Sequence, residues 1–217
     1  MLSFGTDGVR GVANADLTPE LALALGRASA RVLGGDVVVV GRDTRRSGPM
    51  LEAALAAGFA SEGVDVVSLG VVPTPAVAHA AAEQGVPGAM ISASHNPFPD
   101  NGIKLFAAGG RKLADATETQ LEAELAHLLG GGGGERPTGA AVGDVRADDG
   151  AAMTGYAEHL RAAIGGRALD GLSVVLDCAH GAASAIAPEV LRSVGVDVTV
   201  VHAEPDGVNI NDDAGST

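Results

Sequence analysis

Four consecutive valines, Val37 to Val40, constrain the fold of this chain more than any other stretch. An uninterrupted run of β-branched residues is typical of a parallel strand that helices cover on both faces. Apolar residues recur at helical spacing on either side of the run, at Leu21, Leu25, Ala28 and Val32 before it and at Leu51, Leu55 and Phe59 after it. This alternation predicts an α/β fold with right-handed crossovers, in which helices flank a mixed, mostly parallel sheet.

Capping residues, glycines and prolines set the bounds of the other expected elements, and Thr18 is the expected N-cap of the first helix. We expect helices over 19–33, 49–62, 74–84, 115–129, 152–164 and 184–194, and strands over 64–69, 86–91, 103–106, 141–145, 172–176 and 196–201. The five glycines of 130–134 lack the Gly-Lys-Ser/Thr of a phosphate-binding loop and predict a flexible connection. A polar break at 147–150 suggests one unit over 1–149 and a second α/β unit over 150–217.

Charge and cysteine usage exclude several classes of protein. The formal net charge is −13 and no basic patch is found, which argues against a nucleic-acid partner. A single cysteine, Cys178, rules out an internal disulfide framework and fits a reducing cytoplasm. No segment reads as a signal peptide or as a membrane span. Cys178 and His180 lack further ligands at metal spacing, so a buried structural thiol is the expected reading.

Reactive side chains are concentrated in the stretch from Ile91 to Lys104, between two apolar segments. Ser94 is followed at once by His95, and an ammonium stands ten residues later at Lys104. A hydroxyl can carry a phosphoryl group, an imidazole can hydrogen-bond it, and an amine can move a proton or balance charge. The alternative is an ordinary surface turn, because Ser, Asn, Pro, Asp and Gly are also the commonest turn residues.

Two further groups of charged residues stand where a ligand could be bound. Arg10 follows the glycines of the opening Phe4–Gly11 segment, and from such a turn it could reach a phosphate. Arg42 and Asp43 follow the valine run, at the carboxyl end of a predicted strand, where open α/β sheets bind ligands. Because the strands are expected to be parallel, the strand before Ser94 should end at the same edge of the sheet as Arg42. A mobile glycine-rich terminus and a solvated charge cluster are the plain alternatives.

The residues Ser-His-Asn-Pro (94–97) and Asp-Asn-Gly-Ile-Lys (100–104) resemble the phosphoserine loop of the α-D-phosphohexomutase family. The segments 4–11, 41–45, 177–182, 209–211 and 215–217 resemble the same family in the same order, although Ala214 stands where a Cys is expected. The resemblance implies domain I of the family over 1–149 and an incomplete domain II over 150–217.

Within the family, the opening segment and the spacing before Lys104 are closest to the branch that acts on glucosamine phosphate. The resemblance implies interconversion of glucosamine 6-phosphate and glucosamine 1-phosphate through a phosphoserine and a sugar bisphosphate, in the cytoplasm, for UDP-N-acetylglucosamine and cell-wall synthesis. A hexosamine phosphate is the expected partner and Mg²⁺ the expected cofactor, with a homodimer left open. The implied catalytic residues are Ser94, Lys104, His95 and Arg10, the implied substrate-lining residues are Arg42, Asp43 and Asn96, and Mg²⁺ is held through the phosphate on Ser94.

The Asp-Gly-Asp-x-Asp-Arg metal loop of the family is absent from this sequence. We therefore expect the chain to end inside the second domain and to have little or no mutase activity alone. The alternatives are a phosphomannomutase or phosphoglucomutase of the same family and a stand-alone phosphosugar-binding module. A serine hydrolase using Ser94 and His95 has little support, because adjacent side chains point apart and no Gly-x-Ser-x-Gly elbow is present.

Overall fold

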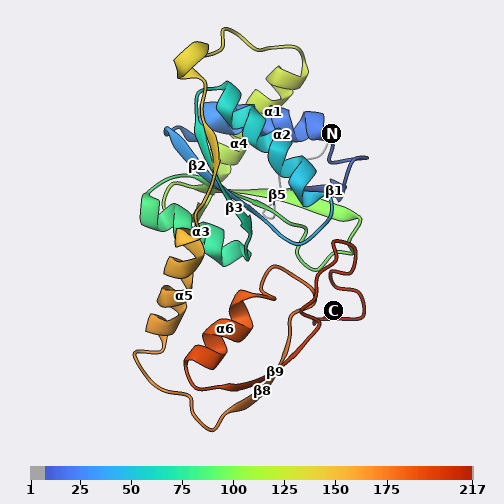
Figure 1. Cartoon of the computed structure of the whole chain (residues 1–217). Helices are drawn as coiled ribbons and strands as arrows, with labels where there is room; N and C mark the ends of the chain where they lie inside the picture. The colour runs from blue at the N-terminus through green and yellow to red at the C-terminus, as the bar shows by residue number, and fades with distance from the viewer. Residues whose placement is uncertain (1–7, 217) are drawn as a thin grey trace.

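A mixed sheet flanked by helices forms the larger part of the structure, a computed structural model that describes residues 8–216 (Figure 1). Along these residues its strands run in the order β1-β5-β4-β2-β3-β7, and β6 pairs with β5. The strands are β1 (Val9–Val12), β2 (Val37–Arg42), β3 (Asp65–Val71), β4 (Gly88–Ile91), β5 (Asp100–Ala107), β6 (Arg111–Lys112) and β7 (Val145–Ala147). The mixed α/β class predicted from the sequence is confirmed.

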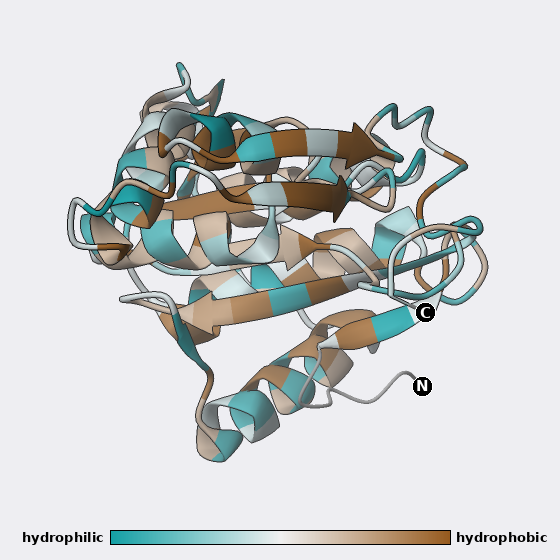
Figure 2. Cartoon of the chain, turned by 90° about the horizontal axis from the view of Figure 1, so that it is seen from below, coloured by the Kyte–Doolittle hydropathy of each residue, from teal (hydrophilic) through white to brown (hydrophobic). Residues whose placement is uncertain are grey.

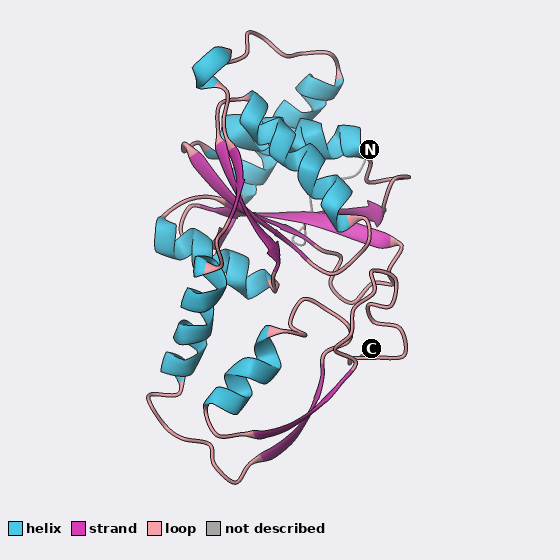
Figure 3. Cartoon of the chain, viewed as in Figure 1, coloured by secondary structure: helices cyan, strands magenta, loops and turns pink. Residues whose placement is uncertain are grey.

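Helices cover both faces of this sheet (Figure 3). On one face lie α1 (Pro19–Leu33), α2 (Gly48–Ser61) and α4 (Asp115–Leu129), and on the other lies α3 (Thr74–Gln84). The hydroxyl of Thr18 accepts from the amide of Leu21, so the predicted N-cap of α1 is formed. At α2, Ser47 occupies the cap position but makes no cap bond, and its hydroxyl instead accepts from Asn101.

Parallel and antiparallel pairs both occur in this sheet, as the predicted mixed class requires. Strand β2 is parallel to β3 and β4, as its valine run requires, and β3 is parallel to β7. The pairs β1–β5, β4–β5 and β5–β6 are antiparallel. The loop 92–99 joins β4 to β5 without a crossover helix, and so short a connection places its two strands antiparallel. The strand predicted over 141–145 is displaced to Val145–Ala147, because a 3-10 turn (Gly139–Ala141) precedes it.

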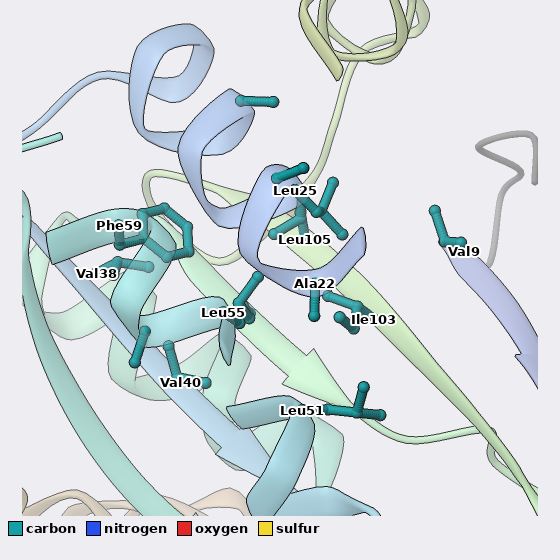
Figure 4. Packing of buried hydrophobic residues seen from close by; sticks show 14 of the residues in the cluster. Val9, Ala22, Leu25, Val38, Val40, Leu51, Leu55, Phe59, Ile103 and Leu105 are labelled. Carbon is teal, nitrogen blue, oxygen red and sulfur yellow. The ribbon is translucent and has the colours of Figure 1, made fainter. Parts of the chain in front are cut away.

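Aliphatic side chains build the core between the sheet and helices α1, α2 and α4 (Figure 4). Val38 and Val40 of β2 pack there with Leu55 and Phe59 of α2, all at most 1% exposed. Seen from another side, apolar residues follow the strands while the helices alternate apolar and polar residues (Figure 2). Val39 packs in the cluster on the opposite face, so β2 buries both faces, as the valine run predicts.

Helices α1 and α2 approach each other through a pair of glycines. A Cβ added to Gly58 would lie 2.3 Å from the carbonyl oxygen of Leu23 and 2.9 Å from the Cα of Gly26. No side chain fits in that space without moving one of the two helices. The glycines therefore set the distance between α1 and α2, and through it the packing over β2.

We expect Gly58→Ala to lower the free energy of unfolding by about 2 kcal/mol, because overpacking outweighs the better helix propensity of alanine. Gly155→Ala in α5 (Ala151–Ala163) is the matched control, since its added Cβ would meet only the His79 ring, at 3.9 Å. That change should raise stability by about 0.5–1 kcal/mol. Urea denaturation measures both, and a Gly58→Ala variant as stable as the native chain would contradict the packing described here.

The second unit contains α5 (Ala151–Ala163), β8 (Ser173–Asp177), α6 (Ile186–Ser193) and β9 (Asp197–Val201), with β8 and β9 parallel. Helix α5 packs on α3, and their residues share a buried cluster with α6. The centroid of the His79 ring in α3 lies 5.7 Å from that of the Tyr156 ring and 4.7 Å from that of the His159 ring, so His79 is a packed histidine.

The boundary between the two units at 149/150 remains a prediction. Among residues 8–216, no helix combines the length and apolar character needed to cross a membrane.

Candidate functional site

The parallel strands β2 and β4 end side by side, where Arg42 pairs with Ile91. Beyond this point the amide of Asp43 donates to the carbonyl of Ile91 at 3.0 Å. The loop 92–99 therefore leaves the sheet at the edge where the segment after the valine run also ends. The sequence prediction that these two segments meet is confirmed.

Ser94 lies exposed in this loop, with His95 exposed beside it. Its backbone is left-handed, with φ of 56°, a conformation that is uncommon for residues other than glycine and that often marks functional sites. The amide of Ser94 donates to the Ser92 hydroxyl at 3.0 Å, and the amide of Asn96 donates to the carbonyl of Ala93 at 3.1 Å. These two bonds form a tight turn with the Ser94 side chain facing solvent.

Arg45 holds the loop from beneath, although it is a fully buried cation. Its Nε donates to Oδ2 of Asp43 at 2.9 Å. Its two terminal nitrogens donate to four carbonyl oxygens of the loop, those of Ser94, Asn96, Pro97 and Asp100, at 2.6–3.0 Å. A guanidinium has five N–H donors in a rigid fork, and here all of its nitrogens are engaged. Arg45 therefore determines the path of the chain that carries Ser94.

Asp43 belongs to the same support and does not face the loop surface. Its side chain is buried, and Oδ2 also accepts from the Ser92 hydroxyl at 2.7 Å. Because that hydroxyl in turn accepts from the amide of Ser94, a chain of hydrogen bonds runs from Asp43 to the proposed phosphate carrier. The sequence placed Asp43 against the substrate, whereas its burial places it behind the loop, where it compensates the charge of Arg45.

Arg42 and Asn96, the other two expected lining residues, both have partners within the protein. Nε of Arg42 lies 2.8 Å from Oε2 of Glu52 in a half-buried ion pair. The Asn96 amide donates to Oδ2 of Asp100 at 2.9 Å. Arg42 also lines a hollow of about 520 Å³ between the two units. To contact a ligand, the Arg42 guanidinium must either break its ion pair with Glu52 or keep it and donate through its other nitrogens.

Arg10 and Lys104 lie on one face of the sheet. Arg10 of β1 pairs directly with Gly102 of β5, and Lys104 stands two residues further along β5 on the same side. A Cβ on Gly102 would lie 2.8 Å from Cγ of Arg10 and 2.7 Å from the carbonyl oxygen of Ser92, so only glycine lets the arginine lie there. Nζ of Lys104 is 6.0 Å from the centroid of the Phe106 ring. The rest of the opening motif, residues 4–7, lies outside the described residues.

The second unit reaches this loop through one side chain that the sequence did not single out. Nδ2 of Asn211 donates to the carbonyls of Ser94 and Asn96, both at 3.0 Å. Two further bonds join the units nearby, from the hydroxyl of Thr44 to the carbonyl of His180 at 2.7 Å and from the amide of Arg46 to the carbonyl of Gly207 at 2.9 Å. The family-like segment 209–211 was the available signal, but it did not indicate what Asn211 contacts.

Asp177, at the end of β8, anchors the turns around this junction. Its carboxylate accepts from the backbone amides of Ala179 and Gly215, and these two bonds lower the pKa of Asp177 to about 2. Nδ1 of His202 lies 3.0 Å from Oδ2 of Asp177. Burial, with a smaller effect from the Asp177 charge, raises the pKa of the neighbouring Cys178 thiol. Across residues 8–216 no three His, Cys, Asp or Glu side chains are grouped so as to hold a metal. Cys178 is a buried structural thiol, as expected.

Comparison with known proteins points to a single family. Residues 1–129 match the family described as phosphoglucomutase/phosphomannomutase, alpha/beta/alpha domain I. The phosphoglucosamine mutase of Mycolicibacterium gilvum is 58% identical over 222 residues, covering 99% of this chain and 48% of the relative. That of Saccharopolyspora erythraea is 56% identical over 221 residues, with the same coverage. The chain thus spans about half the length of the curated relatives it matches.

Solved structures agree with this result. A phosphoglucomutase/phosphomannomutase family protein of Burkholderia thailandensis is 30% identical, with a TM-score of 0.77 over 95% of this chain and 46% of that one. The open form of parafusin, a phosphoglucomutase of Paramecium, gives a TM-score of 0.67 at 16% identity, over 95% of this chain and 44% of that one. The second likeness supports the fold alone.

Proposed function

Because this chain belongs to the phosphoglucomutase/phosphomannomutase family, we propose that it forms the phosphate-carrying half of a cytoplasmic phosphoglucosamine mutase. The observation that supports this most is the exposed, left-handed Ser94 on a loop that a buried Arg45 holds by four carbonyls. Phosphoryl transfer depends mainly on positioning and on neutralising oxygen charge, and this loop is built to position. The product would supply UDP-N-acetylglucosamine for cell-wall synthesis.

In the proposed reaction, phosphoserine 94 donates its phosphoryl group to the free hydroxyl of a hexosamine phosphate. The bond between phosphorus and the serine oxygen breaks, a new bond to the sugar oxygen forms, and the hydroxyl proton passes to a base. The resulting sugar bisphosphate turns round, and its other phosphate returns to Ser94. The net result exchanges glucosamine 6-phosphate and glucosamine 1-phosphate and leaves the serine phosphorylated.

The other residues take roles that fit their positions. Lys104 is the proposed acid and base, and His95 hydrogen-bonds the phosphate from the adjacent position. Arg10 shares a sheet face with Lys104 and stabilises negative charge on the transferring group. Asn96 and Arg42 line the site if they exchange their present partners for substrate. Asp43 acts through Arg45 and Ser92.

Mg²⁺ is the proposed cofactor, but the described residues do not fit a complete site for it. A magnesium ion needs several oxygen ligands. Within residues 8–216 a phosphate on Ser94 would offer one, but no cluster of carboxylates lies there to supply the others. The remaining ligands must come from elsewhere in a working enzyme. We therefore expect the 217-residue chain alone to show little or no turnover.

The test compares three substrates, namely glucosamine, glucose and mannose 6-phosphates, each with the matching sugar 1,6-bisphosphate as primer and Mg²⁺. It uses the longest natural polypeptide that contains this sequence, with the 217-residue chain in parallel. We expect the longer protein to prefer the glucosamine compound by about tenfold or more in kcat/KM. A preference for glucose or mannose phosphate would identify a phosphoglucomutase or phosphomannomutase instead. Binding without turnover in every form would indicate a phosphosugar-binding module.

A further inference from the structure

The carbonyl oxygens of Ser94 and Asn96 each accept two hydrogen bonds, and the two donors belong to different units. From the first unit, the same terminal nitrogen of Arg45 donates to both, at 3.0 and 2.8 Å. From the second unit, Nδ2 of Asn211 donates to both, at 3.0 Å each. A carbonyl oxygen has two lone pairs, so each of these is fully used. Together the four bonds hold the peptide groups that follow Ser94 and Asn96.

The amide of Asn211 is aimed by the backbone of the second unit. Asn211 is itself left-handed, with φ of 62°, a conformation that asparagine adopts more readily than most residues. The backbone amide of Asn211 donates to the carbonyl of Ala179 at 3.0 Å. Ala179 and His180 are left-handed as well. The turn after β8, at Ala179 and His180, and the left-handed backbone of Asn211 itself therefore fix the direction of the Asn211 side chain.

We infer that Asn211 is a positioning residue for Ser94, and that the phosphate-carrying geometry of the loop depends on the second unit being docked. The role assigned to Ser94 rests on the proposed function, whereas the contact itself does not. If the second unit moves away, Arg45 still holds the two carbonyls, but each loses one of its two donors. The loop is then held from one side only, and Ser94 is free to leave its left-handed conformation.

The test uses Asn211→Asp, which keeps the shape of the side chain but points a carboxylate at two carbonyl oxygens. Asn211→Gly removes the amide without straining the left-handed backbone. Asn209→Asp is the matched control, because the Asn209 side chain bonds only to residues 204 and 206 of its own segment. All three are made in the 217-residue chain, with thermal melting to confirm that each remains folded.

Hydrogen exchange at the amides of Asn96 and Asp100, which donate within the loop, is the main measurement. We expect exchange about tenfold faster in Asn211→Asp, the factor that one ordinary hydrogen bond contributes, a smaller effect in Asn211→Gly, and none in Asn209→Asp. Protonating the carboxyl group that Asn211→Asp introduces restores a hydrogen-bond donor. As the pH falls, the NMR chemical shift of the Asn96 amide in this variant should therefore move back toward its value in the native chain. Native-like exchange in Asn211→Asp would overturn the inference.

A second measurement separates this inference from the proposed function. In the longer natural polypeptide, Asn211→Asp should lower kcat for glucosamine 6-phosphate about tenfold while KM stays within about twofold, since a misplaced nucleophile slows transfer without weakening sugar binding. An unchanged kcat beside faster loop exchange would refute the positioning role. If the native protein does not turn over at all, the proposed function fails, while the exchange result still decides whether Asn211 holds the loop.

Discussion

Replacing Ser94 with alanine is expected to reduce mutase turnover by about a thousandfold or more, because it removes the hydroxyl proposed to carry the phosphate. The Ser94 hydroxyl donates to no described residue, and the side chain is exposed. Little stability should therefore be lost with it, because serine already has the Cβ that makes a left-handed backbone costly and alanine adds no further strain. The measurement is turnover of glucosamine 6-phosphate in the longer polypeptide, with intact mass to read the phosphate.

Ser94→Gly separates the chemical effect from the conformational one, since glycine adopts φ of 56° without strain. Both variants should lose the phosphate and the activity, and Ser94→Gly should be the more stable of the two, because it relieves the left-handed strain. Turnover within a few-fold of the native protein in either variant would exclude Ser94 as the phosphate carrier. A phosphate that remains on the 92–104 peptide would do the same.

Arg45→Met is expected to lower the free energy of unfolding by about 3–5 kcal/mol, the usual effect of removing one partner of a buried ion pair. The change leaves the buried carboxylate of Asp43 without its cation and removes one hydrogen-bond donor from each of four carbonyls. Urea denaturation measures the loss. Hydrogen exchange should show the loop 92–100 as the region most affected.

The double variant Asp43→Asn with Arg45→Met tests the cause of that loss. Removing the charge of Asp43 should recover part of the stability, because the single variant suffers from an uncompensated buried charge. Arg45→Lys is the second control, since lysine keeps the charge but cannot reach four carbonyls with one ammonium. A loss below about 1 kcal/mol in Arg45→Met would show that the loop is held by other contacts.

The sequence predicted β2 and the surrounding helices because their signals are local. A run of four valines and apolar residues at helical spacing describe their own surroundings, and the Thr18 cap marks a helix start wherever the helix packs. The position of Ser94 at the shared end of β2 and β4 followed from the parallel order of these strands. The antiparallel course of β5 did not, because strand direction depends on the path of the connecting loop.

The support of the site was less visible than its surface. Asp43 and Arg45 stand in a polar, charged segment that reads as solvated, yet both are buried. What buries them is the loop 92–99, about fifty residues away in the chain, and no local pattern reports on that contact. Asn211 is more distant still. The residues proposed to carry the chemistry were thus predicted from their type and order, while the residues that hold them in place required the structure.

Left-handed backbone outside glycine is concentrated around the junction of the two units, at Ser94, Ala179, His180, His202, Asn211 and Asp213 among the described residues. Glycine would adopt these conformations with less strain, so the present residues keep the chain less stable than it need be. Evolution for thermal stability alone would favour glycine at such positions, and at Ser94 and Asn211 it would remove the proposed phosphate carrier and the side chain proposed to position it. The junction therefore marks a trade-off between stability and activity, and stabilising substitutions should be sought elsewhere in the chain.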